Sequence, residues 1–159
     1  MLTYTLYSEN ETILFGKKIA KSLRPGTFLA LKGTLGAGKT CLCRGILSEL
    51  GHVGHVKSPT YPLVEIYSLA SATIYHFDFY RIKNPMEVIE AGFREAFLDT
   101  NICLVEWPQN AKGVLRGRST SRHPGGNTNA NNCQLSLCGD GSFLNTGINT
   151  EPSANGSGL

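Results

Sequence analysis

The hydrophobic pattern of the first 50 residues alternates between strand-like and helix-like segments. Residues 1–8 alternate apolar and polar side chains with period two, which predicts a short strand. Residues 8–23 carry apolar side chains at helical spacing after a serine–glutamate capping box, so we expect a helix there. A short apolar run at 27–32 predicts a buried strand, and 41–50 predict a second helix.

The next sixty residues add three strand-like segments and a helix. Residues 61–67 and 73–80 are separated by a short connection, which is typical of an antiparallel hairpin. Residues 84–98 are expected to form a helix, with Pro85 in the first turn, where its missing N–H costs nothing. The apolar run 101–107, closed by a proline, predicts a further buried strand.

The composition changes abruptly at about Gly113. Of the last 47 residues, 28 are Gly, Ser, Thr, Asn or Pro, Phe143 is the only aromatic residue, and only residues 134–137 hint at alternation. Such a segment cannot bury enough apolar surface to offset its ordering entropy. We therefore expect residues 1–112 to form the folded domain and residues 113–159 to be a disordered low-complexity tail.

Length and composition narrow the class of protein. A chain of 159 residues with 41% hydrophobic and 17% charged residues is typical of one soluble globular domain. The net charge of +3 is scattered, so it argues for neither DNA nor a membrane surface as a partner. The five cysteines show no metal-ligand spacing, and the sequence has no membrane-spanning or signal-like run. We expect a cytoplasmic protein with reduced thiols.

Residues 33–40 match the phosphate-binding loop pattern G-x-x-x-x-G-K-[ST] at every fixed position. Strand, glycine loop and helix is the order that phosphate binding needs, because loop N–H groups and the helix N-terminus both favour an anion. We expect Lys39 to reach the β- and γ-phosphates and Thr40 to ligate Mg²⁺. An ordinary glycine-rich turn is the weaker interpretation, since both flanks fit. The candidate ATP-binding residues of the loop are Gly33, Leu35, Gly36, Ala37, Gly38, Lys39 and Thr40.

Two acidic residues are candidates for the chemistry that follows phosphate binding. Glu106 ends an apolar strand, where it can meet Mg²⁺ or its bound water across from Thr40; a solvated strand-end carboxylate is the alternative. Asp78 lies within an otherwise apolar strand. It could hold a metal-bound water or orient the attacking water, with a salt bridge to Arg81 as the competing interpretation.

Three further residues stand near these positions in the sequence. Thr60 follows a Ser-Pro pair on a loop that could close on the γ-phosphate, although a plain turn is equally compatible. Trp107, the only tryptophan, directly follows Glu106 and could stack on a base, anchor a partner or fill the core. His76 is expected to be a hydrogen-bonded sheet residue rather than a catalytic base.

Four segments appear in the order and spacing of the TsaE family, and over about residues 1–112 the chain resembles that family. These segments are 33–40, 56–61 (VKSPTY), 75–81 (YHFDFYR) and 102–108 (ICLVEWP). The resemblance implies an α/β, P-loop NTPase-like fold with a mixed sheet flanked by helices. It also implies a slow, Mg²⁺-dependent ATPase that works with TsaB and TsaD, the pair that installs threonylcarbamoyl on adenosine 37 of ANN-reading tRNAs, so tRNA is an indirect partner.

The resemblance also implies roles for single residues. The metal ligands would be Thr40 and Glu106. Trp107 matches a functionally important tryptophan, and Glu9 lies where similar proteins approach the nucleotide base. The implied catalytic residues are Lys39, Asp78 and Glu106.

Two departures from the family pattern stand out. Thr34 occupies a loop position where the family usually has Asp, which alters the local charge without removing a ligand. The alternating strands that follow the E-W-P strand in similar proteins are missing or replaced by the Asn/Gly/Ser-rich tail. We hypothesise that residues from about Arg116 are an out-of-frame reading of the original C-terminal region. Translation of the underlying DNA in the other two frames, in search of alternating apolar segments, tests this hypothesis.

Two other functions remain open from the sequence. A P-loop small-molecule kinase is disfavoured because no Arg-rich lid or acceptor site follows the loop. A nucleotide-gated binding module, in which hydrolysis matters only as a timer for a partner, uses the same residues.

Overall fold

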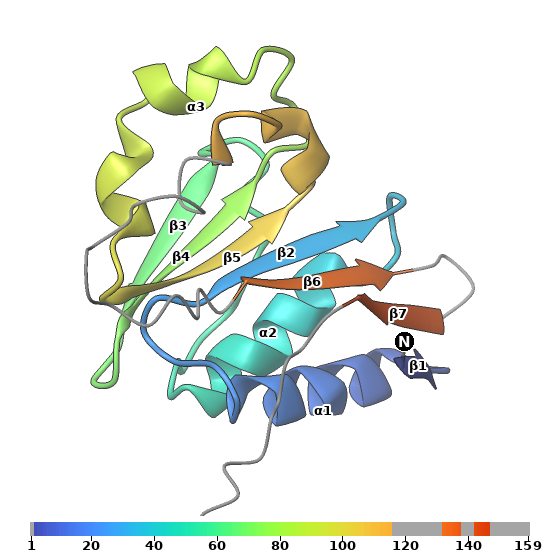
Figure 1. Ribbon diagram of the computed structural model, residues 1–159. Coiled ribbons are helices and arrows are strands. Elements are labelled where there is room, and N and C mark those ends of the chain that lie inside the picture. The colour runs from blue at the N-terminus through green and yellow to red at the C-terminus, as the bar shows by residue number, and fades with distance from the viewer. Residues whose placement is uncertain (1, 116–131, 138–141, 147–159) are drawn as a thin grey trace, which may run out of the picture.

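The computed structural model describes residues 2–115, 132–137 and 142–146 (Figure 1). Among them, seven strands form one sheet in the order β1-β7-β6-β2-β5-β4-β3. The strands are β1 (Leu2–Thr5), β2 (Phe28–Gly33), β3 (Val64–Ser68), β4 (Thr73–Asp78), β5 (Asn101–Glu106), β6 (Asn132–Leu137) and β7 (Ser142–Thr146). The helices are α1 (Glu9–Ala20), α2 (Lys39–Glu49), α3 (Met86–Glu90) and the 3₁₀ turns η1 (Phe93–Phe97) and η2 (Pro108–Ala111). None of these helices is long and apolar enough to cross a membrane.

The centre of the sheet is parallel. β2 pairs in parallel with both β5 and β6, and β4 pairs in parallel with β5. β3 adds to β4 as the antiparallel hairpin that the sequence predicts, and β7 pairs antiparallel with β6 and with β1. The mixed sheet flanked by helices is therefore confirmed.

Helices cover both faces of the sheet. α1 and α2 lie on one face, and α3 with η1 lies on the other (Figure 1). Period-two alternation along the strands decides which side chains meet which helices. The core on the α2 side includes Leu29, Leu31, Ile74, Ile102 and Leu104 from the strands with Leu42, Ile46 and Leu47 from α2. The core on the opposite face includes Phe77, Cys103 and Val105 with Phe79, Val88 and Ala96.

Helices α1 and α2 begin where the sequence signals predict. The Ser8 hydroxyl caps α1 by accepting the N–H of Glu11 at 3.2 Å, and the Glu11 carboxylate accepts the N–H of Tyr7 at 2.7 Å. α2 begins directly after Gly38, whose backbone is left-handed, and ends just before Gly51. Local sequence thus fixes both ends of the helix that follows the loop.

The single helix predicted for residues 84–98 is wrong. The segment is divided into α3 and η1, because Gly92 adopts a left-handed backbone (φ 76°) that ends the first helix. Pro85 is the N-cap residue rather than the first helical residue. The helical pattern of apolar residues is satisfied by two short turns that bury Val88 and Ala96 on the same face of the sheet.

The prediction that the C-terminal strands are missing or replaced by a disordered tail is wrong for residues 132–137 and 142–146, which form β6 and β7. β6 pairs with the edge of β2 that β5 leaves open, and β7 connects it to β1. Leu135 of β6 is 1% exposed and belongs to the core on the α2 side. Pairing with β2 satisfies backbone hydrogen-bonding groups of β6, which composition does not report. The expected disorder of residues 116–131, 138–141 and 147–159 lies outside the described residues, and the frame hypothesis stays a prediction.

α1 and α2 touch at two glycines. A Cβ built on Gly45 would lie 2.2 Å from the carbonyl oxygen of Ile13, and one built on Gly16 would lie 2.5 Å from that of Leu42. No side chain fits between backbones at these distances. The glycines therefore set how closely α1 approaches the helix that carries the loop.

Gly45→Ala should destabilise the fold by about 2 kcal/mol, because the methyl group forces the two helix backbones apart. Urea denaturation gives the change in the free energy of unfolding. Ser48→Ala, an exposed substitution on the same helix, is the matched control and should stay within about 0.5 kcal/mol of the parent. Equal stability of the two variants would contradict the close packing.

Candidate active site

The candidate site lies where the carboxyl ends of three parallel strands meet the start of α2. Leu31 of β2 and Asp78 of β4 both pair in register with Glu106 of β5. Asp78 and Glu106 lie on the face of the sheet that α2 covers, in the same rows as Ile74 and Leu104. This end of an open parallel sheet is where ligands commonly bind in α/β proteins.

The glycine loop has the backbone that phosphate binding requires. Gly36 and Gly38 adopt left-handed backbone conformations (φ 77° and 94°), which residues other than glycine rarely adopt. Thr34, Leu35 and Gly36 are exposed, whereas Lys39 is 4% exposed. The loop thus ends at a helix N-terminus, whose N–H groups and partial positive charge favour an anion.

Lys39 is held inside the loop by contacts on several sides. Its ammonium group donates to the carbonyl oxygens of Gly33 at 2.9 Å and Thr34 at 2.7 Å, and it lies 4.1 Å from the centroid of the Trp107 ring. Burial lowers the pKa of Lys39, and the nearby carboxylates of Glu106 and Asp78 oppose that shift. Because Thr34 contributes only its backbone carbonyl, the unusual residue at this position leaves the contact intact.

The two expected metal ligands touch each other. The Thr40 hydroxyl donates to the Glu106 carboxylate, at 2.9 Å from Oε1 and 3.2 Å from Oε2, and Glu106 is 2% exposed. Hydroxyl and carboxylate oxygens are the donors that Mg²⁺ prefers. Two buried carboxylates, Glu106 and Asp78, also outnumber the one buried ammonium group of Lys39. Donor type and charge therefore both fit a divalent cation.

Asp78 is fixed by the loop that carries Thr60. Its Oδ2 accepts hydrogen bonds from the hydroxyls of Ser58 and Thr60, the latter at 2.7 Å, and its Oδ1 accepts the N–H of Tyr80 at 2.9 Å. Arg81 lies 4.0 Å over the ring of Tyr61. No salt bridge between Asp78 and Arg81 is found among the described residues. The competing interpretation, that Asp78 serves only as an ion-pair partner of Arg81, is therefore not supported.

Trp107 sits at the border of the site with an unusual backbone. It adopts φ 57°, a left-handed conformation uncommon outside glycine, and its N–H donates to the carbonyl oxygen of Leu31 at 3.2 Å. Its ring lies 5.0 Å from that of Tyr80 and beneath the Lys39 ammonium group. The half-buried indole thus packs against the core on the side of Phe77 and Val105 and also contacts Lys39 at the border of the site.

Glu9 approaches the site from α1. Its exposed carboxylate forms an ion pair with Arg44 of α2. In the next turn of α1, the methyl group of Thr12 lies 3.7 Å from where a Gly38 Cβ would stand. Glu9 therefore lies beside the start of α2, and a direct role toward the nucleotide base stays a prediction.

Comparisons with known proteins identify the family of this chain. Residues 6–130 match the family model described as "Threonylcarbamoyl adenosine biosynthesis protein TsaE". The chain belongs to the TsaE family. A relative from Haemophilus influenzae, named tRNA threonylcarbamoyladenosine biosynthesis protein TsaE, is 45% identical over 119 residues, covering 72% of this chain and 75% of the relative.

More distant members of the TsaE family share the same fold. The Bacillus subtilis TsaE protein is 36% identical over 106 residues, covering 67% of this chain and 66% of the relative. A crystal structure of B. subtilis YdiB superposes with a TM-score of 0.64 at 26% identity, covering 89% of this chain and 80% of that chain. The family is one of tRNA threonylcarbamoyladenosine biosynthesis.

Two residues of this TsaE-family site were missed or assigned a lesser role from the sequence. Ser58 was not among the predicted site residues, although it lies on the Thr60 loop, and its hydroxyl donates a hydrogen bond to Asp78. His76 was expected to be a hydrogen-bonded sheet residue, and its Nε2 lies 2.8 Å from Oε1 of Glu106. The alternation of residues 74, 76 and 78 along one face of β4 is the signal that places His76 beside the acidic pair.

Asp78→Ala should destabilise the protein by about 2–4 kcal/mol, because two hydroxyls and one N–H lose their acceptor in a buried setting. Urea denaturation measures the loss, and trypsin cleavage at Lys57 reports loosening of the loop. Asp78→Asn keeps one acceptor oxygen and should lose less. Glu90→Ala, an exposed charge removal, is the control. If Asp78→Ala matches Glu90→Ala, Asp78 does not anchor the loop.

Proposed function

We propose that this protein binds and hydrolyses ATP with Mg²⁺, and that this activity serves threonylcarbamoyl modification of adenosine 37 in ANN-reading tRNAs, together with TsaB and TsaD in the cytoplasm. The observation that carries the proposal is the meeting of a buried loop lysine and hydroxyl with two buried carboxylates at one edge of the sheet. Family membership supports the tRNA pathway.

Each residue has a distinct task in this proposal. The N–H groups from Gly33 to Gly38 and the ammonium group of Lys39 bind the phosphates of ATP. Thr40 and Glu106 hold Mg²⁺, which neutralises the charge that develops on the transferred phosphoryl group. Trp107 bounds the site beside the ammonium group of Lys39.

Asp78 is the candidate for orienting the attacking water. Its carboxylate is held on one side by Ser58 and Thr60 and on the other by the N–H of Tyr80, so its direction is fixed. A carboxylate with fixed geometry can accept a hydrogen bond from a water and align it for in-line attack.

A second candidate function, a nucleotide-gated binding module, has one observation in its favour. The loop that carries Ser58 and Thr60 ends in Tyr61, whose side chain is 80% exposed, so the site is connected to a surface aromatic residue. A movement of Asp78 would be transmitted toward Tyr61 through the hydrogen bonds that Ser58 and Thr60 donate to Asp78. Hydrolysis would then control a partner rather than drive chemistry.

Lys39→Ala should abolish ATP binding, whereas Glu106→Gln and Asp78→Asn should keep binding and lose at least about 100-fold in kcat, because they act after the phosphates are bound. Titration with a fluorescent ATP analogue measures binding, and phosphate release without an added acceptor measures hydrolysis. Lys17→Ala, a lysine of α1, is the control for charge removal. Full hydrolysis by Glu106→Gln would remove Glu106 from the catalytic set, and phosphate release that needs an acceptor would favour a kinase.

The gating function makes its own prediction about partners. If hydrolysis is a timer, purified TsaB–TsaD should bind this protein at least about tenfold more tightly with a non-hydrolysable ATP analogue than with ADP. Biolayer interferometry with both nucleotides measures the difference. Indifference to the nucleotide would leave the ATPase proposal standing and exclude the gate.

A further inference from the structure

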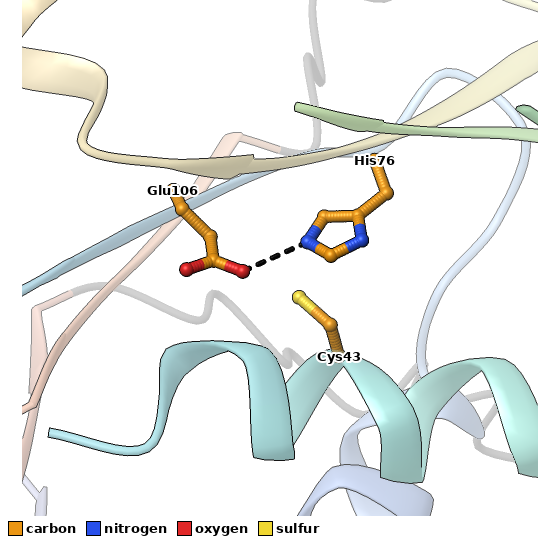
Figure 2. A group of neighbouring side chains, drawn as sticks. All are labelled: Cys43, His76 and Glu106. Atoms are coloured by element: carbon orange, nitrogen blue, oxygen red, sulfur yellow. Dashed lines mark hydrogen bonds and ion pairs between the residues drawn. The ribbon is translucent and has the colours of Figure 1, made fainter. Parts of the chain in front are cut away.

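Glu106, whose carboxylate is expected to hold the metal, belongs to a buried polar cluster. Figure 2 shows His76 of β4 and Glu106 of β5 pointing toward each other above Cys43 of α2. The three candidate ligand atoms lie within 4.8 Å of one another, and all three side chains are buried. His76 is fully buried, at 0% exposure.

The hydrogen bonds in this cluster define what His76 does. Its Nε2 lies 2.8 Å from Oε1 of Glu106, and its Nδ1 has no hydrogen-bond partner among the described residues. A carboxylate only accepts, so the proton is on Nε2, which donates to Glu106. The Thr40 hydroxyl of α2 donates a hydrogen bond to the same Oε1, at 2.9 Å. Because Nε2 and Oε1 are already bonded to each other, the cluster is a hydrogen-bonded support for Glu106 rather than a separate metal centre.

We infer that His76 is the positioning residue of the metal site. By donating to Oε1 of Glu106 from β4, it holds the carboxylate in the orientation that meets Thr40, in which Glu106 and Thr40 together would hold the cation. This inference rests on the proposed function, and it gives His76, which was expected only as a hydrogen-bonded sheet residue, a role at the metal site. Outer-shell partners of metal ligands act in this way, and their loss commonly costs about 10–100-fold in metal affinity or activity.

The chain offers a matched series of substitutions to test the inference. His76→Gln places an amide N–H near the position of Nε2 and keeps the donor. His76→Asn has a shorter side chain, whose amide stands near the position of Nδ1 and does not reach Glu106. His76→Leu removes the donor and keeps the bulk. Cys43→Ala changes the same cluster without touching the hydrogen bond, so it controls for altered packing.

Trp107 provides a readout that does not depend on turnover. It is the only tryptophan, and its ring lies against Lys39 in the candidate site. Its fluorescence is followed while Mg²⁺ is added to protein saturated with a non-hydrolysable ATP analogue, and the nucleotide affinity without Mg²⁺ is measured in parallel. His76→Asn and His76→Leu should raise the half-saturating Mg²⁺ concentration about tenfold or more, with metal-free nucleotide affinity unchanged. His76→Gln and Cys43→Ala should stay within about threefold of the parent.

The outcomes separate this inference from the proposed function. If the parent protein neither responds to Mg²⁺-nucleotide nor hydrolyses ATP, the proposed function fails and the role of His76 fails with it. If the parent responds and His76→Asn titrates like His76→Gln, the positioning role is overturned while the ATPase stands. Should His76→Leu fail to fold, the comparison of the two amide variants still decides, because they differ mainly in reach.

Discussion

The burial of the Glu106 carboxylate is the constraint on which the candidate site depends. A carboxylate that is 2% exposed is costly unless its oxygens accept hydrogen bonds and a cation lies nearby. Thr40 and His76 donate to it from two different elements, and Lys39 supplies a positive charge close enough that Glu106 opposes the downward shift of the lysine pKa. The Glu106 carboxylate of β5 therefore connects the glycine loop to β4 and β5 through hydrogen bonds.

Two further residues of the site are held by contacts with neighbouring elements. Asp78 is anchored by two hydroxyls of the 56–61 loop, and Trp107 is held in a left-handed backbone conformation by its N–H bond to β2. Strained backbone of this kind persists only where the surroundings fix it. Fixed side chains at one edge of a parallel sheet are consistent with the preorganisation that the proposed ATPase activity needs.

Several elements followed from local sequence, and others did not. The helices around the glycine loop and the central strands were predicted because caps and alternation act over a few residues. The helix at 84–98 was wrong because Gly92 takes a left-handed backbone that the apolar pattern hides. The C-terminal strands were missed because composition reports side-chain polarity, whereas β6 also pairs its backbone with β2 and buries Leu135.

The sequence by itself determined the candidate phosphate-binding loop, since the glycine positions, Lys39 and Thr40 lie within eight consecutive residues. Only the tertiary structure decided what surrounds that loop. Thr40 meets Glu106 across 66 positions of chain, and His76 meets Glu106 across 30. The register of β4 beside β5 brings these groups together, and register depends on the packing of the whole sheet against α2 rather than on any local pattern.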